Sequence, residues 1–181
     1  DVYKRQQKYG NTMDIITGDG GFDFSVNFNV QETTSTRLLF SQICFALSLQ
    51  RSGGMFILKL FDCFNRSTID LIYILFMCYE TCYITKPLTS RVSNSERYLV
   101  CCNFKYTTTH NLLPIWKTMY SKFESGISVK GFLKTTIPYY LTNKRAEWTK
   151  PDLRSANLFS SLVVLHNFDV ADYASRNCNK R

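Results

Sequence analysis

The hydrophobic and polar positions of this chain follow two periods, one typical of strands and one typical of helices. Short apolar runs rich in β-forming residues occupy residues 13–19, 55–61, 81–87 and 96–104. Two longer segments, 31–54 and 65–80, repeat their apolar positions at helical spacing, as Leu39, Ile43 and Leu47 do. Strands that alternate with helices predict an α/β fold with a mainly parallel sheet.

Local signals predict where these elements begin and end. Gly53 and Gly54 are expected to stop the first helix, and Ser67 or Thr68 to cap the second. The strand after the two glycines is almost continuously apolar, so it is expected to be buried on both faces of the sheet. Only the polar loop 88–95 joins the last two strands, which predicts that they pair antiparallel.

Three ionisable residues are predicted to meet at one edge of this sheet. Asp19 ends its strand, Lys59 lies near the end of the next one, and Glu96 begins the antiparallel strand. Taken singly, each has an ordinary explanation: a snorkelling lysine, a turn aspartate, an exposed strand glutamate. Together at one edge they favour a functional site, because a buried ammonium needs opposite charge nearby.

The composition is that of a globular protein with an anionic partner. The 181 residues are 45% hydrophobic and carry a formal net charge of +8. That surplus favours nucleic acid as the partner. The longest apolar stretch, Leu71 to Tyr79, is far shorter than the roughly 20 residues of a membrane span, so no membrane partner is expected.

The cysteines predict a reducing, intracellular environment and no metal site. Their number is odd and several lie in apolar runs, as free cysteines do: Cys44, Cys63, Cys78, Cys82, Cys101, Cys102 and Cys178. The sequence has no C-x-x-C pair and only two histidines, His110 and His166, so zinc ligation is not expected.

Three motifs resemble those of a known family. DIITGDGGFD, GGMFILKLFDCF and KPLTSRVSNSERYLVC occur in an order that resembles the FtsJ-like 2′-O-ribose methyltransferases. The likeness is greatest to the members that methylate mRNA caps in eukaryotes and large DNA viruses. It covers roughly residues 13–104, with 40 positions from Asp19 to Lys59 and 37 from Lys59 to Glu96.

The resemblance implies a fold and a division of the chain. Residues 13–104 are expected to form the C-terminal half of a Rossmann-like, S-adenosylmethionine-dependent methyltransferase sheet, with parallel strands ending in an antiparallel hairpin. Residues 105–181 are expected to be a mainly helical extension, with helices at 112–123 and 155–168. Residues 1–12 are expected to be a non-native or truncated edge, and the first six, DVYKRQ, are left out of the fold prediction.

The resemblance also implies site residues. Asp19, Lys59 and Glu96 match three members of the family's Lys-Asp-Lys-Glu tetrad, and Asp19, Gly20 and Gly21 match its contacts to the cofactor, S-adenosylmethionine. The first lysine and the glycine-rich cofactor loop are expected upstream of residue 1, so these 181 residues alone are expected to be inactive. The residues that the resemblance assigns to RNA are Asn29, Ser90, Arg91, Asn94 and Ser95.

The function that this set implies is methyl transfer to a ribose 2′-hydroxyl. That hydroxyl needs a group that orients it and accepts its proton, and Lys59 in its neutral form is suited to both tasks. The expected substrate and partner is the first transcribed nucleotide of capped mRNA. A ribosomal or transfer RNA ribose methyltransferase and a non-catalytic RNA-binding remnant are the alternatives. The expected location is the nucleus for a cellular protein, and a cytoplasmic factory or the virion for a viral one.

Overall fold

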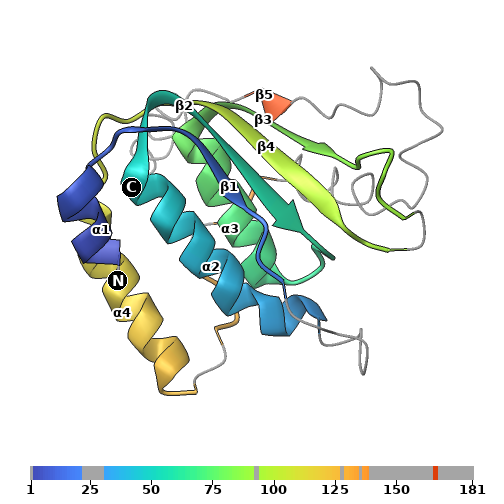
Figure 1. Ribbon diagram of the computed structural model, residues 1–181. Coiled ribbons are helices and arrows are strands. Elements are labelled where there is room, and N and C mark those ends of the chain that lie inside the picture. Colours follow the sequence, from blue (N-terminus) through green and yellow to red (C-terminus); the bar gives the residue numbers. More distant parts are fainter. Residues whose placement is uncertain are drawn as a thin grey trace, which may run out of the picture.

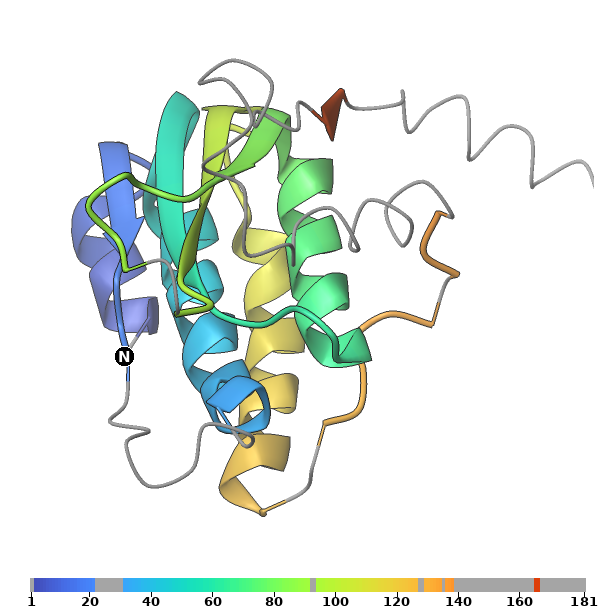
Figure 2. The same ribbon diagram turned by 90° about the vertical axis from the view of Figure 1, so that its right-hand side faces the viewer.

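The structure is a sheet with helices along one side (Figures 1 and 2). The computed structural model describes residues 2–21, 31–91, 94–126, 129–134, 136–138 and 165–166. The elements follow in the order α1 (Val2–Tyr9), β1 (Met13–Gly18), α2 (Gln31–Leu49), β2 (Gln50–Leu60), α3 (Arg66–Cys78), β3 (Tyr79–Thr85), β4 (Arg97–Phe104), a 3-10 turn (His110–Leu112), α4 (Leu113–Glu124) and β5 (Leu165–His166).

The sheet has the mixed topology that the sequence predicts. Its order is β1-β2-β4-β3-β5, with β1 and β2 parallel. The hairpin of β3 and β4 is antiparallel, as predicted, and β4 also pairs antiparallel with β2. The amino end of β4 therefore lies at the same edge as the carboxyl ends of β1 and β2.

The prediction that β2 is buried on both faces is wrong. Its side chains alternate: Phe56, Leu58 and Leu60 are buried, whereas Met55, Ile57 and Lys59 are only partly covered. The reason is the layering, because α2, α3 and α4 all lie on the same side of the sheet (Figure 2). Lys59 thus belongs to the face turned away from these helices.

Gly53 and Gly54 do not stop a helix; they form an irregularity in a strand. The helix α2 ends at Leu49, and β2 begins at Gln50. In the parallel pairing, Met13 is opposite Gln50 while Ile15 is opposite Met55, so β2 uses extra residues here. The Gln50 amide folds back to donate to the carbonyl oxygens of Met13 and Asp14. Gly53 has φ +76°, and a Cβ on Gly54 would lie 2.1 Å from the Gln50 amide nitrogen.

Two other element ends differ from the prediction. The N-cap of α3 is Asn65, whereas Ser67 and Thr68 are buried inside the helix. The strand β3 ends at Thr85 because Pro87, two residues on, has no N–H to donate to a neighbouring strand.

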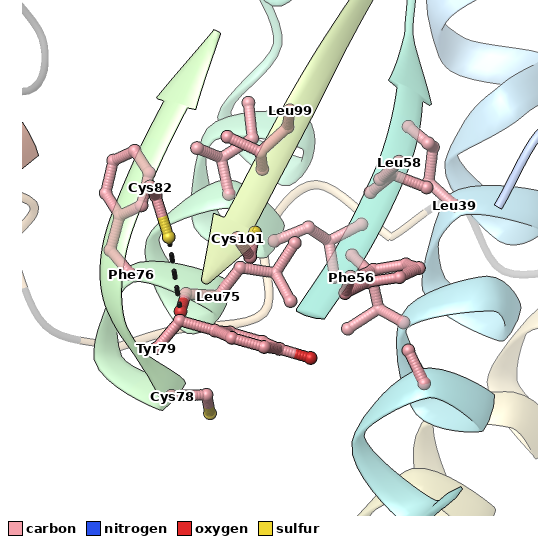
Figure 3. Packing of buried hydrophobic residues seen from close by; sticks show 14 of the residues in the cluster. Leu39, Phe56, Leu58, Leu75, Phe76, Cys78, Tyr79, Cys82, Leu99 and Cys101 are labelled. Atoms are coloured by element: carbon pink, nitrogen blue, oxygen red, sulfur yellow. Dashed lines mark hydrogen bonds between the residues drawn. The ribbon is translucent and has the colours of Figure 1, made fainter. Parts of the chain in front are cut away.

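The core lies between the sheet and the helices. Figure 3 shows Leu58 of β2 beside Leu39 of α2, and Cys101 of β4 near Leu75 of α3. The six cysteines of the described chain are free, and all but Cys102 are buried. Burial raises the pKa of the Cys78 thiol to about 12, so this thiol is protonated and behaves as an apolar side chain.

Residues after the sheet pack onto the same core. The Phe132 ring stacks on Phe40 of α2, with ring centroids 5.2 Å apart. The fully buried Asp70 carboxylate of α3 accepts hydrogen bonds from the backbone N–H groups of Phe132 (2.7 Å) and Leu133 (3.0 Å), and it pairs with Arg66 (2.6 Å). One buried charge therefore ties residues 132–133 to α3.

The two ends of the chain agree with the expected elements only in part. The segment left out of the fold prediction forms α1, which contacts α2 and buries Gln6. The helix expected at 112–123 is present as α4. Of the helix expected at 155–168, the structure describes Leu165 and His166 alone. These two residues pair antiparallel with β3 as strand β5, at the outer edge of the sheet. The rest of the expected helix lies outside the described residues.

Candidate functional site

Asp19 and Lys59 form an ion pair at the edge of the sheet. Gly18, the last residue of β1, pairs with Leu58 of β2, and the parallel register brings the next residue of each strand together. The Lys59 Nζ atom lies 2.8 Å from Asp19 Oδ1, and it also contacts the Asp19 carbonyl oxygen at 3.4 Å. The Lys59 side chain is 17% exposed and that of Asp19 is 66% exposed, so the carboxylate faces solvent and the amine is enclosed.

Glu96 completes this edge, held by three hydrogen bonds. Its Oε1 accepts from the Tyr98 hydroxyl at 2.7 Å, and its Oε2 accepts from Ser90 Oγ and Asn94 Nδ2, each at 3.1 Å. The bond from Tyr98 is the main cause that lowers the pKa of Glu96; partial burial opposes it, and the bonds from Asn94 and Ser90 and the charge of Lys59 reinforce it.

Tyr98 links the three residues electrostatically. It lies opposite Lys59 in the antiparallel register of β2 and β4. Burial, the hydrogen bond to Glu96 and the negative charges of Glu96 and Asp19 raise the pKa of Tyr98 to about 12. Its hydroxyl is therefore a donor at neutral pH. Asp19, Lys59 and Glu96 thus form one electrostatic cluster, as their places at strand ends predict.

The turn after β1 lies close against the rest of the site. The backbone N–H of Gly20 donates to Gln42 Oε1 of α2 at 3.1 Å. A Cβ on Gly18 would lie 2.8 Å from the same oxygen, whereas a Cβ on Gly21 would be 3.7 Å from Lys59 Nζ. Gly18 is therefore needed for packing, whereas a Cβ on Gly21 would meet the amine only at ordinary contact distance.

The loop residues assigned to RNA have different surroundings. Ser90 and Asn94 turn their side chains onto Glu96, as described above. Arg91 is exposed, and the carbonyl of half-buried Ser95 accepts from Arg97 at 2.6 Å. Asn29 lies outside the described residues.

Three residues of this site were not predicted from the sequence. Gln42 fixes the Gly20 turn, Tyr98 holds Glu96, and Lys86, which is 9% exposed, binds the loop between β3 and β4. Tyr98 and Lys86 both lie inside the KPLTSRVSNSERYLVC motif, which is the signal that could have found them; Gln42 carries none. The described residues contain no group of three or more His, Cys, Asp or Glu that could hold a metal ion, and no helix among them is both long and apolar enough to span a membrane.

The sequence of the chain is similar to that of two proteins named as cap-specific mRNA methyltransferases. The chain is 46% identical over 91 residues to the human cap-specific mRNA (nucleoside-2′-O-)-methyltransferase 1, across 50% of this chain and 11% of that protein. It is 48% identical over 93 residues to the Trypanosoma cruzi protein of the same name, across 51% of this chain and 26% of that protein.

A crystal structure described as a candidate ribosomal RNA methyltransferase from Plasmodium falciparum resembles 56% of this chain and 53% of its own, with 27% identity and a TM-score of 0.44. The chain matches about a tenth to a quarter of the length of these curated relatives. The sequence profile of the FtsJ-like methyltransferases matches residues 2–104, which include β1 to β4 and the whole cluster of Asp19, Lys59 and Glu96. The chain belongs to the FtsJ-like methyltransferase family.

Proposed function

We propose that the protein containing this chain transfers a methyl group from S-adenosylmethionine to the ribose 2′-hydroxyl of the first transcribed nucleotide of capped mRNA. The observation that carries the proposal is the enclosed Lys59 amine, 2.8 Å from Asp19 at the edge that Glu96 completes. The identity to cap-specific relatives supports this substrate. Capped RNA is then the partner, and the free buried thiols suit a reducing intracellular compartment.

The cofactor fits the turn after β1. A methionine-like group needs a backbone that it can approach closely, and the Gly20–Gly21 turn offers one next to Lys59. We assign Asp19, Gly20 and Gly21 to the methionine side of the cofactor. When bound there, S-adenosylmethionine supplies an electrophilic methyl group.

Lys59 carries the proton chemistry in this proposal. Its Nζ atom orients the ribose hydroxyl and accepts the hydroxyl proton as the oxygen attacks. The amine accepts this proton in its neutral form. Asp19 and Glu96 hold the amine in place and stabilise the charge that it gains. RNA phosphate and ribose are proposed to lie against Asn29 and against the loop residues Ser90, Arg91, Asn94 and Ser95.

Methyl transfer to matched capped and uncapped transcripts by the full-length protein tests this function. Lys59→Ala should lower turnover about a hundredfold or more, because general-base catalysis is lost, while cofactor affinity measured by calorimetry stays within about threefold. Lys59→Arg should also fail, since arginine stays protonated. Lys117→Ala, at an exposed lysine of α4, is the matched control.

Each alternative has its own outcome in this experiment. Equal activity of the wild type on uncapped transcripts would move the assignment to a ribosomal or transfer RNA ribose methyltransferase. RNA binding without methyl transfer would indicate a non-catalytic remnant. Activity of Lys59→Ala close to that of the wild type would refute the role of Lys59.

A further inference from the structure

Lys86 is a buried cation that contacts both sides of the loop between β3 and β4. Lys86 comes directly after the last residue of β3, and it is 9% exposed. The Nζ atom donates to the Asn94 carbonyl oxygen at 2.7 Å, to Asn94 Oδ1 at 2.8 Å and to the Glu96 carbonyl oxygen at 3.0 Å. Its three protons are shared with a fourth, longer contact to Ser90 Oγ at 3.3 Å. The ammonium therefore joins the start of the loop to its end, next to Glu96.

The ammonium determines which way the Asn94 amide faces. An ammonium donates hydrogen bonds and accepts none, whereas an asparagine amide has one accepting and one donating end. The contact from Lys86 therefore selects Oδ1 as the inward end of Asn94. The donating end, Nδ2, is left to face Glu96 Oε2 at 3.1 Å. A reversed amide would set an oxygen against the carboxylate.

The same contact directs the Ser90 hydroxyl. This hydroxyl lies 3.2 Å from Asn94 Oδ1 and 3.1 Å from Glu96 Oε2, but it has a single proton to donate. Because Lys86 already donates to both Asn94 Oδ1 and Ser90 Oγ, the hydroxyl proton is best used toward Glu96. Two of the three bonds that hold the Glu96 carboxylate thus depend on Lys86.

We propose that Lys86 is a positioning residue for Glu96: its ammonium orients the Asn94 amide and the Ser90 hydroxyl so that both donate to the carboxylate. The kinetic consequence rests on the proposed function, because Glu96 matters for turnover only if this edge is catalytic. The structural consequence does not. Lys86 acts through Glu96 and not by touching the substrate, since the residue is 9% exposed.

A double-mutant cycle in the full-length protein tests the kinetic consequence. Lys86→Met keeps the apolar stem and removes the donor, and it should lower kcat about tenfold or more by misplacing Glu96, with the KM for S-adenosylmethionine within about twofold. In a Glu96→Gln background the same substitution should change kcat less than about twofold. Equal factors in both backgrounds would show that Lys86 acts independently of Glu96 and would overturn the proposal.

Titration of the Glu96 carboxyl by carbon-13 NMR tests the structural consequence without any activity. In the wild type the pKa of Glu96 should lie below its ordinary value. Lys86→Met should raise this pKa, and Asn94→Ala, which keeps the ammonium, should raise it too. A Glu96 pKa unchanged in Lys86→Met overturns the proposal. A pKa raised in Lys86→Met but unchanged in Asn94→Ala also overturns it, since charge alone would then be acting.

Controls separate positioning from loss of stability and from failure of the proposed function. Asp70→Asn weakens the buried tie to residues 132–133, away from this edge, and should leave the Glu96 titration and kcat unchanged below its melting temperature. If Lys86→Met does not fold, Asn94→Ala, at a partly exposed position, decides the question by the same titration. If the wild type transfers no methyl group, the proposed function fails while the titration still tests Lys86.

Discussion

Tyr98 and Lys59 lie directly opposite each other on β4 and β2, yet the Tyr98 hydroxyl bonds Glu96 and not the lysine. The antiparallel pairing thereby brings the neutral Tyr98 side chain next to Lys59, while its hydroxyl donates to Glu96, the second carboxylate of the site. Glu96 influences Lys59 through its charge, while Asp19 pairs with the amine directly. The two carboxylates of the site therefore have unequal tasks.

Tyr98→Phe should release the Glu96 carboxylate. The substitution removes the donor to Oε1 and should raise the pKa of Glu96, because that bond is the main cause of its low value. The loss of one hydrogen bond should cost about 1 kcal/mol in the free energy of unfolding. Urea unfolding and carbon-13 titration measure the two effects. Tyr83→Phe, on β3, is the control, and an equal rise of the Glu96 pKa there would contradict the assignment.

The Glu96 carboxylate should stabilise the fold in a pH-dependent way. Its folded pKa is lowered from the ordinary 4.5, so the unfolded chain binds this proton more tightly. The contribution is fully present above about pH 5 and is lost as the pH falls through the lowered value. The difference in unfolding free energy between wild type and Glu96→Gln should thus be constant from about pH 7 to pH 5 and shrink below that range. A difference that grows on acidification would reverse the assigned direction.

Two glycines of the same turn should respond differently to alanine. Gly18→Ala places a Cβ 2.8 Å from Gln42 Oε1 and 2.9 Å from Leu58, so it should cost about 1–3 kcal/mol in unfolding free energy. Gly21→Ala meets only ordinary contacts and should leave stability nearly unchanged while weakening cofactor binding. Thermal unfolding and calorimetry of S-adenosylmethionine binding measure these effects. Unchanged affinity in Gly21→Ala would remove Gly21 from the cofactor site.

Asp70 should contribute more stability than any exposed ion pair of the described chain. Asp70→Ala leaves two backbone N–H groups and Arg66 without their buried acceptor, which should cost about 3 kcal/mol or more. Asp14→Ala breaks the exposed pair with Arg51 and should cost less than about 1 kcal/mol. Urea unfolding of both variants gives the comparison. Similar losses would show that residues 132–133 are not held through Asp70.

The sequence was sufficient for most of the elements and for bringing Asp19, Lys59 and Glu96 to one edge, because each lies at or near an end of its strand and the carboxyl ends of parallel strands share an edge. It was insufficient where an interaction depends on a distant partner. Gly53 reads as a helix stop until the Gln50 side chain is seen to fold onto β1. Lys86 has the sequence position of an ordinary strand-end cation, because its acceptors on Asn94 and Glu96 come near it only in the folded chain.

The irregularity at Gly53 and Gly54 bears on how this chain tolerates changes of length. Beyond it, β2 alternates strictly, so deleting one residue between Met55 and Leu58 would move Lys59 into the core and a core side chain into the place of Lys59 beside Asp19. At the two glycines, β2 already carries unpaired extra residues, and one more or one fewer leaves the later register intact. Insertions and deletions among descendants of this sequence should therefore accumulate before Met55 and be absent between Met55 and Lys59.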